Sequence, residues 1–181
     1  VRTLGIVRGS AGLLLLFPSM SRASNTPVDM PEEDLLILEF VAGRWVLEEA
    51  FLTYQTGDRL LFPLSAMIEV LEFPIETNSE TGEMRGWFLA PANSFHLVPD
   101  RRVVTIAGER RDIPADALVV SYDDIYVDVD ELERLFPFRF EVDFAQLRVR
   151  ILGDSLLPFQ KRAERHQAWE RFRKARRQTH A

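Results

Sequence analysis

The stretch Asp58–Glu76, DRLLFPLSAMIEVLEFPIE, has the pattern of a short strand, a short helix and a second strand. The same pattern returns 65 positions later, without a gap, in Asp123–Glu141, DDIYVDVDELERLFPFRFE. Apolar positions coincide through all three elements, although few residues are identical. This recurrence predicts an internal repeat, since repeats leave such a signature in the order of elements. The alternative is two unrelated strand–helix–strand units.

Local signals support the helix boundaries in both copies. In the second copy Asp128 and Glu131 fit a capping box, in which each side chain satisfies a backbone N–H at the start of a helix. In the first copy Pro63 holds the matching position, where its fixed φ suits a first helical turn. Pro74 and Pro137 end the two helices, because the residue before proline avoids the helical region.

Runs of apolar and β-branched residues outside the repeat predict further strands. Residues 35–40 and 45–54 form a hairpin around Gly43, and residues 94–98 and 103–106 form another. Met84–Leu89 closes the first unit, and Leu147–Leu152 is its counterpart after a linker two residues shorter. The predicted fold class is α+β: a duplicated β-hairpin plus strand–helix–strand module, mostly antiparallel, with one short helix packed on each sheet. A basic C-terminal helix follows.

The predicted organisation has five segments. They are a signal peptide (1–23), a flexible leader (24–34), a first repeat unit (35–92), a second repeat unit (93–157) and a basic helical tail (158–181). A unit of about 65 residues is marginal alone, so the two units are expected to share a core or to pack together.

Residues 1–23 resemble a secretory signal, with Arg2 and Arg8 ahead of a short apolar core, AGLLLLF. Cleavage is predicted between Ala23 and Ser24, because small residues precede this bond. The apolar core is too short to cross a bilayer. The expected location is the periplasm, with possible association with the outer membrane. A buried helix or a misread start is the alternative.

The leader that follows, SNTPVDMPEE, is polar and contains two prolines. It is expected to be disordered alone and to order on binding, with Met30 as the expected contact to a partner. The alternative is a spacer without a binding role.

Charge is unevenly distributed along the chain. Residues 24–160 hold 11 Arg and 26 Asp or Glu, a net charge of −15, whereas residues 161–181 hold 8 Lys or Arg and 2 Glu, a net charge of +6. An acidic body repels phosphate backbones, which argues against nucleic acid as a partner. The basic tail could contact an anionic membrane, dock on the acidic body or act as a linker, and the last two interpretations are favoured.

The residues favour no enzymatic, metal or cofactor site. An acidic cluster could suggest calcium, but it lacks the alternate spacing and central Gly of an EF-hand loop, so helix capping is favoured. This cluster comprises Asp123, Asp124, Asp128, Asp130 and Glu131. The chain has no Cys. A nucleophile system with Ser94 and His96 lacks a supporting motif, and alternation along a strand explains both residues.

An aromatic platform for sugars is the alternative binding function. It would consist of Trp45, Trp87 and Phe88. Such a platform requires these side chains to be exposed, whereas aromatic residues in strands more often belong to the core.

The order of motifs resembles the periplasmic N-terminal region of fimbrial outer-membrane usher-like proteins of Gram-negative bacteria. The motifs are EFVAGRW, then LLFPLSAMIEVLEFPIE, a GWFL strand, a D-x-Y-V-D-x-x-x-L-x-x-L-F-P-F-x-F-E-V-D segment and an exit through LPFQKRAER, within residues 35–165. More weakly, the strand–helix–strand copies resemble the copper-amine-oxidase N-terminal-like modules of envelope proteins, which lack the oxidase site.

The usher resemblance implies a non-enzymatic module that precedes a transmembrane barrel. Such a module receives a chaperone–subunit complex, or contacts the adjoining outer-membrane barrel, during assembly of a pilus or fimbria. No residues are left to form a barrel before Ala181. The resemblance therefore predicts a fragment, a truncated gene product or a stand-alone relative whose role is recruitment or binding of a protein partner.

Overall fold

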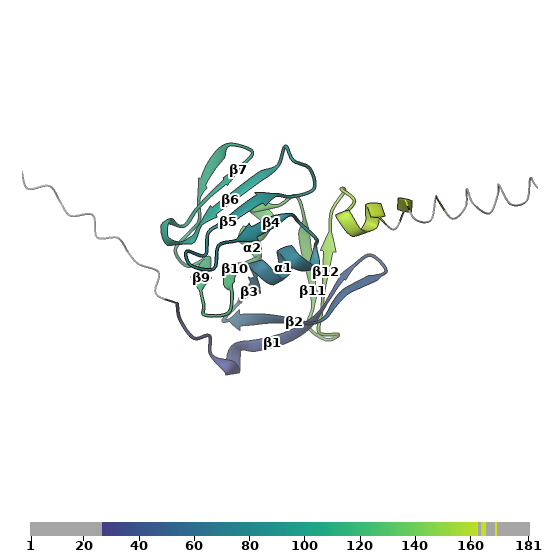
Figure 1. The fold of residues 1–181 in the computed structure, drawn as a ribbon. Helices are drawn as coiled ribbons and strands as arrows, with labels where there is room; N and C mark the ends of the chain where they lie inside the picture. The colour runs from purple at the N-terminus through teal and green to yellow at the C-terminus, as the bar shows by residue number, and fades with distance from the viewer. Residues whose placement is uncertain (1–26, 163, 166–168, 170–181) are drawn as a thin grey trace, which may run out of the picture.

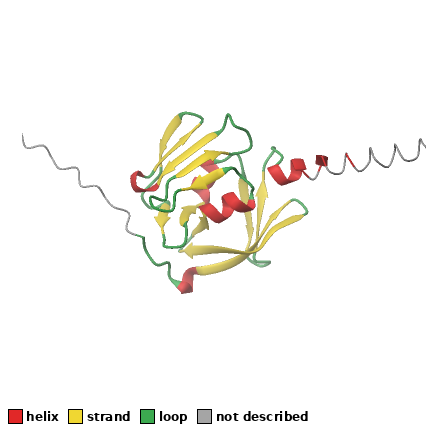
Figure 2. Cartoon of the chain, in the orientation of Figure 1, coloured by secondary structure: helices red, strands yellow, loops and turns green. Residues whose placement is uncertain are grey.

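The computed structural model describes residues 27–162, 164, 165 and 169. Strands dominate and helices are few and short, which agrees with the expected α+β class (Figures 1 and 2). The strands are β1 (Leu35–Ala42), β2 (Trp45–Thr56), β3 (Arg59–Pro63), β4 (Ile75–Thr77), β5 (Met84–Trp87), β6 (Ser94–Val98), β7 (Val103–Ile106), β8 (Glu109–Asp112), β9 (Leu118–Val120), β10 (Ile125–Asp128), β11 (Arg139–Asp143) and β12 (Arg148–Leu152). The helices are α1 (Leu64–Val70), α2 (Val129–Leu135) and two short 3₁₀ helices, η1 (Glu32–Asp34) and η2 (Pro99–Arg101).

The strands form two sheets that mix the predicted units. The larger sheet has the order β11-β12-β1-β2-β3-β10-β9, and the smaller has the order β4-β5-β6-β7-β8. The hairpin after each helix joins strands of the other predicted unit: β12 pairs with β1, and β5 pairs with β6. The units at 35–92 and 93–157 are therefore interleaved around a shared core.

The described strands pair mostly antiparallel, as expected; β1 and β12 are the exception and pair in parallel, with Glu39 opposite Arg148. The expectation of one helix on each sheet is wrong, because both helices pack mainly on the larger sheet: α1 contacts β2, β3 and β10, and α2 contacts β3, β10 and β11. The reason is that β3 and β10, which lead into the two helices, pair with each other.

Equivalent elements keep the spacing of 65 residues throughout the strand–helix–strand stretches. Helix α1 covers residues 64–70 and α2 covers 129–135. In the following hairpins Ile75 lies opposite Gly86, and Phe140 lies opposite Ile151. The closing strands thus keep the same offset, and the expected linker two residues shorter is wrong. Glycine is the only residue that fits beside Pro74 at position 86, because a Cβ there would lie 2.0 Å from the Pro74 carbonyl oxygen.

The long strand β2 has a divided counterpart. The end of β2 pairs with β3 through Gln55 and Leu60, and β9 pairs with β10 through Val120 and Ile125, at the same offset of 65. Upstream, however, β8 and β9 belong to different sheets, and Pro114 lies between them. A proline cannot donate a ladder hydrogen bond, so it favours a break at this point.

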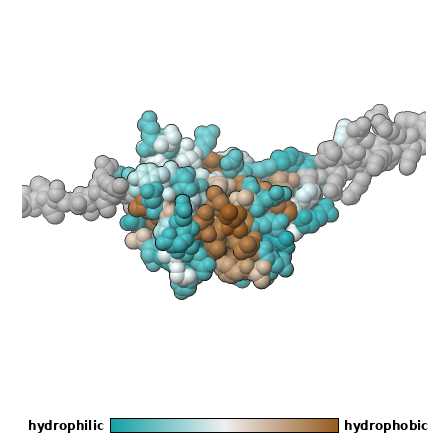
Figure 3. All heavy atoms as spheres, turned by 90° about the horizontal axis from the view of Figure 1, so that it is seen from below, coloured by the Kyte–Doolittle hydropathy of each residue, from teal (hydrophilic) through white to brown (hydrophobic). Residues whose placement is uncertain are grey.

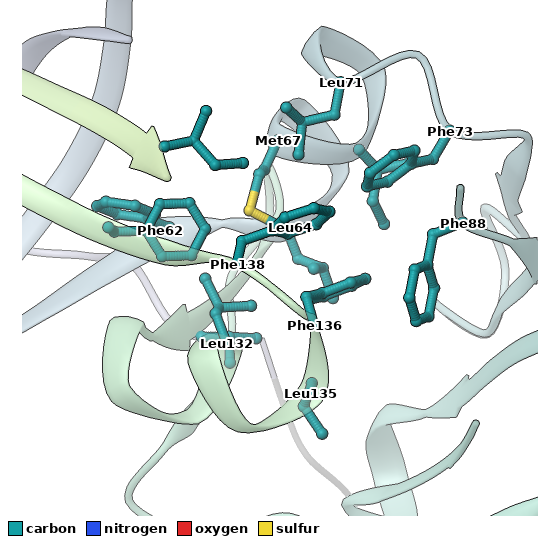
Figure 4. Packing of buried hydrophobic residues seen from close by; sticks show 14 of the residues in the cluster. Phe62, Leu64, Met67, Leu71, Phe73, Phe88, Leu132, Leu135, Phe136 and Phe138 are labelled. Carbon is teal, nitrogen blue, oxygen red and sulfur yellow. The ribbon is translucent and has the colours of Figure 1, made fainter. Parts of the chain in front are cut away.

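One hydrophobic core joins both sheets and both helices. Figure 4 shows side chains of α1, α2 and the loops that follow them meeting at its centre. The ring of Phe136 lies 5.0 Å from that of Phe88 and 5.6 Å from that of Phe95, so loop and smaller sheet are tied together by aromatic contacts. Such pairs stabilise beyond simple burial.

The start of the predicted tail lies against the body. Residues 158–162 are helical, and Leu157 just before them is buried in the core. The Phe159 ring meets the Trp45 ring edge to face at 6.3 Å, and the Arg162 guanidinium donates two hydrogen bonds to the Glu72 carboxylate at 2.6 and 2.7 Å. This arrangement agrees with docking on the body for the first turn, and most of the predicted tail lies outside the described residues.

Candidate interaction surface

An apolar patch lies on the outer face of β1 and β2. Ile37 on β1 lies directly opposite Leu52 on β2, and their side chains are 52% and 45% exposed. Alternation along a strand places their neighbours Leu38 and Phe51 on the other face, in the core. The apolar residues of this stretch therefore occupy both faces of the sheet. A sheet with one face in solvent usually has polar residues on that face.

The turn between β11 and β12 extends this patch. It carries Phe144 and Leu147, which are 52% and 51% exposed. The turn lies next to β1, because the Glu39 backbone N–H donates to the Leu147 carbonyl oxygen at 2.8 Å. We call Ile37, Leu52, Phe144 and Leu147 the apolar ridge. Figure 3 shows hydrophobic side chains gathered on this side of the molecule.

Paired charges border the apolar ridge. Arg148 on β12 forms an ion pair with Glu39 on β1, and Arg150 donates to the Glu141 carboxylate at 2.9 Å. With Phe144, these β11–β12 residues line a shallow pocket of about 310 Å³. An exposed apolar group with a rim of charge is typical of protein interaction sites and is otherwise an aggregation hazard. This surface was not predicted from the sequence, although the run LLILEF has apolar side chains for both faces of a strand.

Part of the leader is placed on the edge of the larger sheet. Val28 forms an isolated parallel bridge with Ser121, and its N–H donates to the Val120 carbonyl oxygen at 3.0 Å. Met30, the predicted partner contact, is half-buried. The structure thus places residues 27–34, whereas ordering of the leader on binding stays a prediction. The predicted cleavage site at Ala23 and Ser24 lies outside the described residues.

Two residues of the acidic cluster, Asp124 and Asp128, cap the two helices. The Asp128 carboxylate accepts from the Asp130 N–H at 2.9 Å and so caps α2, as predicted. The capping box differs from prediction on the other side: Glu131 accepts from the Arg134 guanidinium at 3.0 Å, and the Asp128 N–H donates to the Ala117 carbonyl oxygen.

Asp124 caps the other helix from a distance in sequence. Its two carboxylate oxygens accept from the Ser65 and Ala66 N–H groups, at 2.9 and 3.0 Å. Pro63 occupies the N-cap position of α1 and makes no side-chain capping bond there. The acceptor that α1 lacks locally therefore comes from the residue just before β10, a contact that no local pattern could reveal.

Asp123 and Tyr126 form a further pair. The Tyr126 hydroxyl donates to the Asp123 carboxylate at 2.7 Å, and the tyrosine side chain is buried. Burial and the adjacent carboxylate raise the pKa of Tyr126 well above its usual range. Burial alone would raise the pKa of Asp123, but hydrogen bonds from Tyr126, Ser121 and the backbone lower it.

The three aromatic residues of the predicted sugar platform do not form one surface. Phe88 lies in the core, in ring contact with Phe73 and Phe136. Trp45 belongs to the larger sheet and Trp87 to the smaller. Trp45 is 38% exposed, and its ring contacts Phe159.

Ser94 and His96 both lie on β6, as alternation along a strand predicts. The His96 Nε2 lies 3.4 Å from the Glu83 carboxylate, which also accepts from the Arg85 guanidinium at 2.9 Å. These hydrogen bonds lower the pKa of Glu83. Within residues 27–162, no group of three or more His, Asp or Glu is arranged to hold a metal ion.

A further pocket has a volume of about 620 Å³. It lies between α2, the loop after it and the end of β12, and its lining includes Asp130, Glu133, Arg139 and Asp154. The Glu133 carboxylate accepts from the Phe140 N–H at 2.7 Å, so this acid already has a structural role.

Comparison with known proteins found no match for this chain. No family model matches it, and neither the curated proteins nor the solved structures give a match. Across the part of the chain that the structure describes, no helix combines the length and the apolar character needed to cross a membrane.

Proposed function

We propose that this chain is a non-enzymatic protein-docking module of the periplasm, part of an usher-like system for pilus or fimbria assembly or outer-membrane secretion. Its partner would be a chaperone–subunit complex or an adjoining outer-membrane barrel. The order of sequence motifs supports the system, and the signal-like N-terminus supports the compartment.

The observation that carries the docking role is the apolar ridge. Its four side chains are each 45% exposed or more, although the chain buries a large core elsewhere. Solvating such a group costs free energy that a partner surface would recover, at about 25 cal/mol for each Å² of apolar area buried. The paired charges at its border would fix the orientation of the partner rather than supply most of the affinity.

A pull-down with a matched control tests the proposal. Ile37→Lys should abolish capture of the chaperone–subunit complex, because a charge would be buried in the interface. Val46→Lys is the control, since Val46 lies on β2, is 51% exposed and lies outside the apolar ridge. Both variants should keep the melting temperature of the wild type. Equal capture by both variants would refute docking through this surface.

We also infer that the module is a duplication. The support is the offset of 65 residues shared by α1 and α2, by the hairpins after them and by the pairing of β2–β3 and β9–β10. The first hairpin of each copy departs from this offset by one residue. Strands β1 and β2 turn through Gly43 and Arg44, whereas β7 and β8 turn through Ala107 and Gly108.

We propose further that the tail after Arg162 continues as a basic helix that connects the module to its partner. The docked first turn supports this role, because it fixes the point at which the tail leaves the body. Circular dichroism of a peptide covering residues 157–181, in water and with the partner, measures whether helix forms; absence of helix with the partner would contradict it.

A further inference from the structure

We propose that the outer edge of β9 is an acceptor site for an extended, proline-free segment of a partner protein, and that the leader occupies this edge when the partner is absent. The inference rests on the proposed function only in taking the ligand to be a protein. The site is separate from the apolar ridge, because β3 and β10 lie between β2 and β9 in the sheet.

The backbone of β9 is arranged for strand addition. Strand residues point their N–H and C=O groups alternately to either side. Ala117 and Ser121 use theirs toward β10: the Asp128 N–H donates to the Ala117 carbonyl oxygen, and the Ser121 N–H donates to the Asp124 carbonyl oxygen at 2.9 Å. The backbone N–H and C=O groups of Leu118 and Val120 therefore point away from β10, toward the leader.

The leader is a weak occupant of this edge. Its described residues meet β9 at one isolated bridge, Val28 with Ser121. Pro27 and Pro31 have no N–H to donate, so the leader lacks a ladder donor at both positions. The Val28 side chain is 47% exposed, so little apolar area is buried by the contact. A longer segment without proline would form more ladder hydrogen bonds than the leader does.

The remaining sheet edges are protected in other ways. Strand β8 has the sequence ERRD with all four residues exposed, a charged edge that opposes pairing. Strand β4 has three residues, and β11 has its Phe140 N–H bound by the Glu133 carboxylate. Among the four edge strands of the described sheets, β9 therefore differs from the others, because the N-terminal leader covers it. Strand addition at such an edge is a known mode of peptide recognition.

An engineered disulfide in the full chain tests this site, because the native chain has no Cys. In V28C/S121C the oxidised form fixes the leader on β9, and reduction releases it. The probes are two fluorescent peptides: the leader sequence SNTPVDMPEE and its proline-free form SNTTVDMTEE. Binding is followed by fluorescence anisotropy, with the wild type plus reductant as the control.

The proposal expects the proline-free peptide to bind the wild type at least tenfold more tightly than the leader peptide. Oxidised V28C/S121C should lose this binding at least tenfold, and reduction should restore it. Val28→Pro, which removes the N–H bound to Val120, should bind the peptide several-fold more tightly than the wild type.

Three results would overturn the proposal: equal binding by oxidised and reduced V28C/S121C, no binding by any form, or no gain in Val28→Pro. Ile37→Lys should bind the peptide as the wild type does. Failure at the β9 edge is therefore distinguishable from failure of docking through the apolar ridge.

Discussion

The rings of Phe73 and Phe138 are stacked, with centroids 5.9 Å apart and planes inclined by 14°, and the two residues are 65 positions apart. Each follows one of the helices and is adjacent in sequence to a proline, Pro74 or Pro137. The two loops therefore meet at the centre of the core, as Figure 4 shows.

Phe73→Ala and Phe138→Ala should each lower the free energy of unfolding by about 3–5 kcal/mol, because each leaves a cavity in a packed core. The double variant should lose less than the sum, since each single change already removes the stack. Urea denaturation measures these values. Phe144→Ala on the surface is the control, with a change within about 0.5 kcal/mol. Equal effects for core and surface variants would contradict the packing described.

Asp124→Ala should lower the free energy of unfolding by about 1–2 kcal/mol, because the Ser65 and Ala66 N–H groups lose their acceptor. Asp154→Ala, at an exposed position, is the control and should have little effect. Hydrogen exchange should show that Asp124→Ala opens α1 more than α2, since Asp128 still caps α2. Uniform loosening of both helices would argue against a local capping role.

Stability should fall at alkaline pH. The pKa of Tyr126 is raised in the folded state, so the unfolded chain loses this proton first as the pH rises above about 10. The stabilisation is complete below pH 10, and the free energy of unfolding should fall by about 1.4 kcal/mol for each pH unit above it. Tyr126→Phe should flatten this dependence. The pKa of Tyr54 is also raised, so part of the dependence should persist in the variant. An unchanged slope in Tyr126→Phe would assign the effect to other groups.

The docked first turn of the tail should protect the chain from trypsin. Arg162→Ala removes the two hydrogen bonds to Glu72 and should speed cleavage after Lys161, whose ammonium lies 3.5 Å from the Leu89 carbonyl oxygen. Glu72→Gln should act in the same direction, whereas Glu76→Gln, at an exposed position on β4, should not. The rate of cleavage followed by mass spectrometry decides between these outcomes.

Local chemistry predicted both helices, because an apolar face runs through each. Pro137 ends α2 as predicted, since Phe136 before it is extended. Helix α1 instead ends at Val70, and Glu72 has a positive φ of 56°, so Pro74 lies beyond the end of this helix. Local chemistry could not predict β8, since ERRD has no apolar residue to mark a strand. The parallel pairing of β1 and β12 joins segments about a hundred residues apart, which no local pattern encodes. The apolar ridge was not predicted for a related reason: the turn that carries Leu147 comes beside β1 only through that pairing.

Phe62 on β3 lies opposite Val127 on β10, again 65 positions apart, and the flanking pairs Leu61–Asp128 and Pro63–Tyr126 exchange with each other under the same offset. An antiparallel ladder with this property is self-complementary. A half-length chain carrying one copy would present an edge that matches its own, and we expect such a chain to associate as a twofold homodimer through it. The duplication that we infer would then correspond to such a dimer joined into one polypeptide.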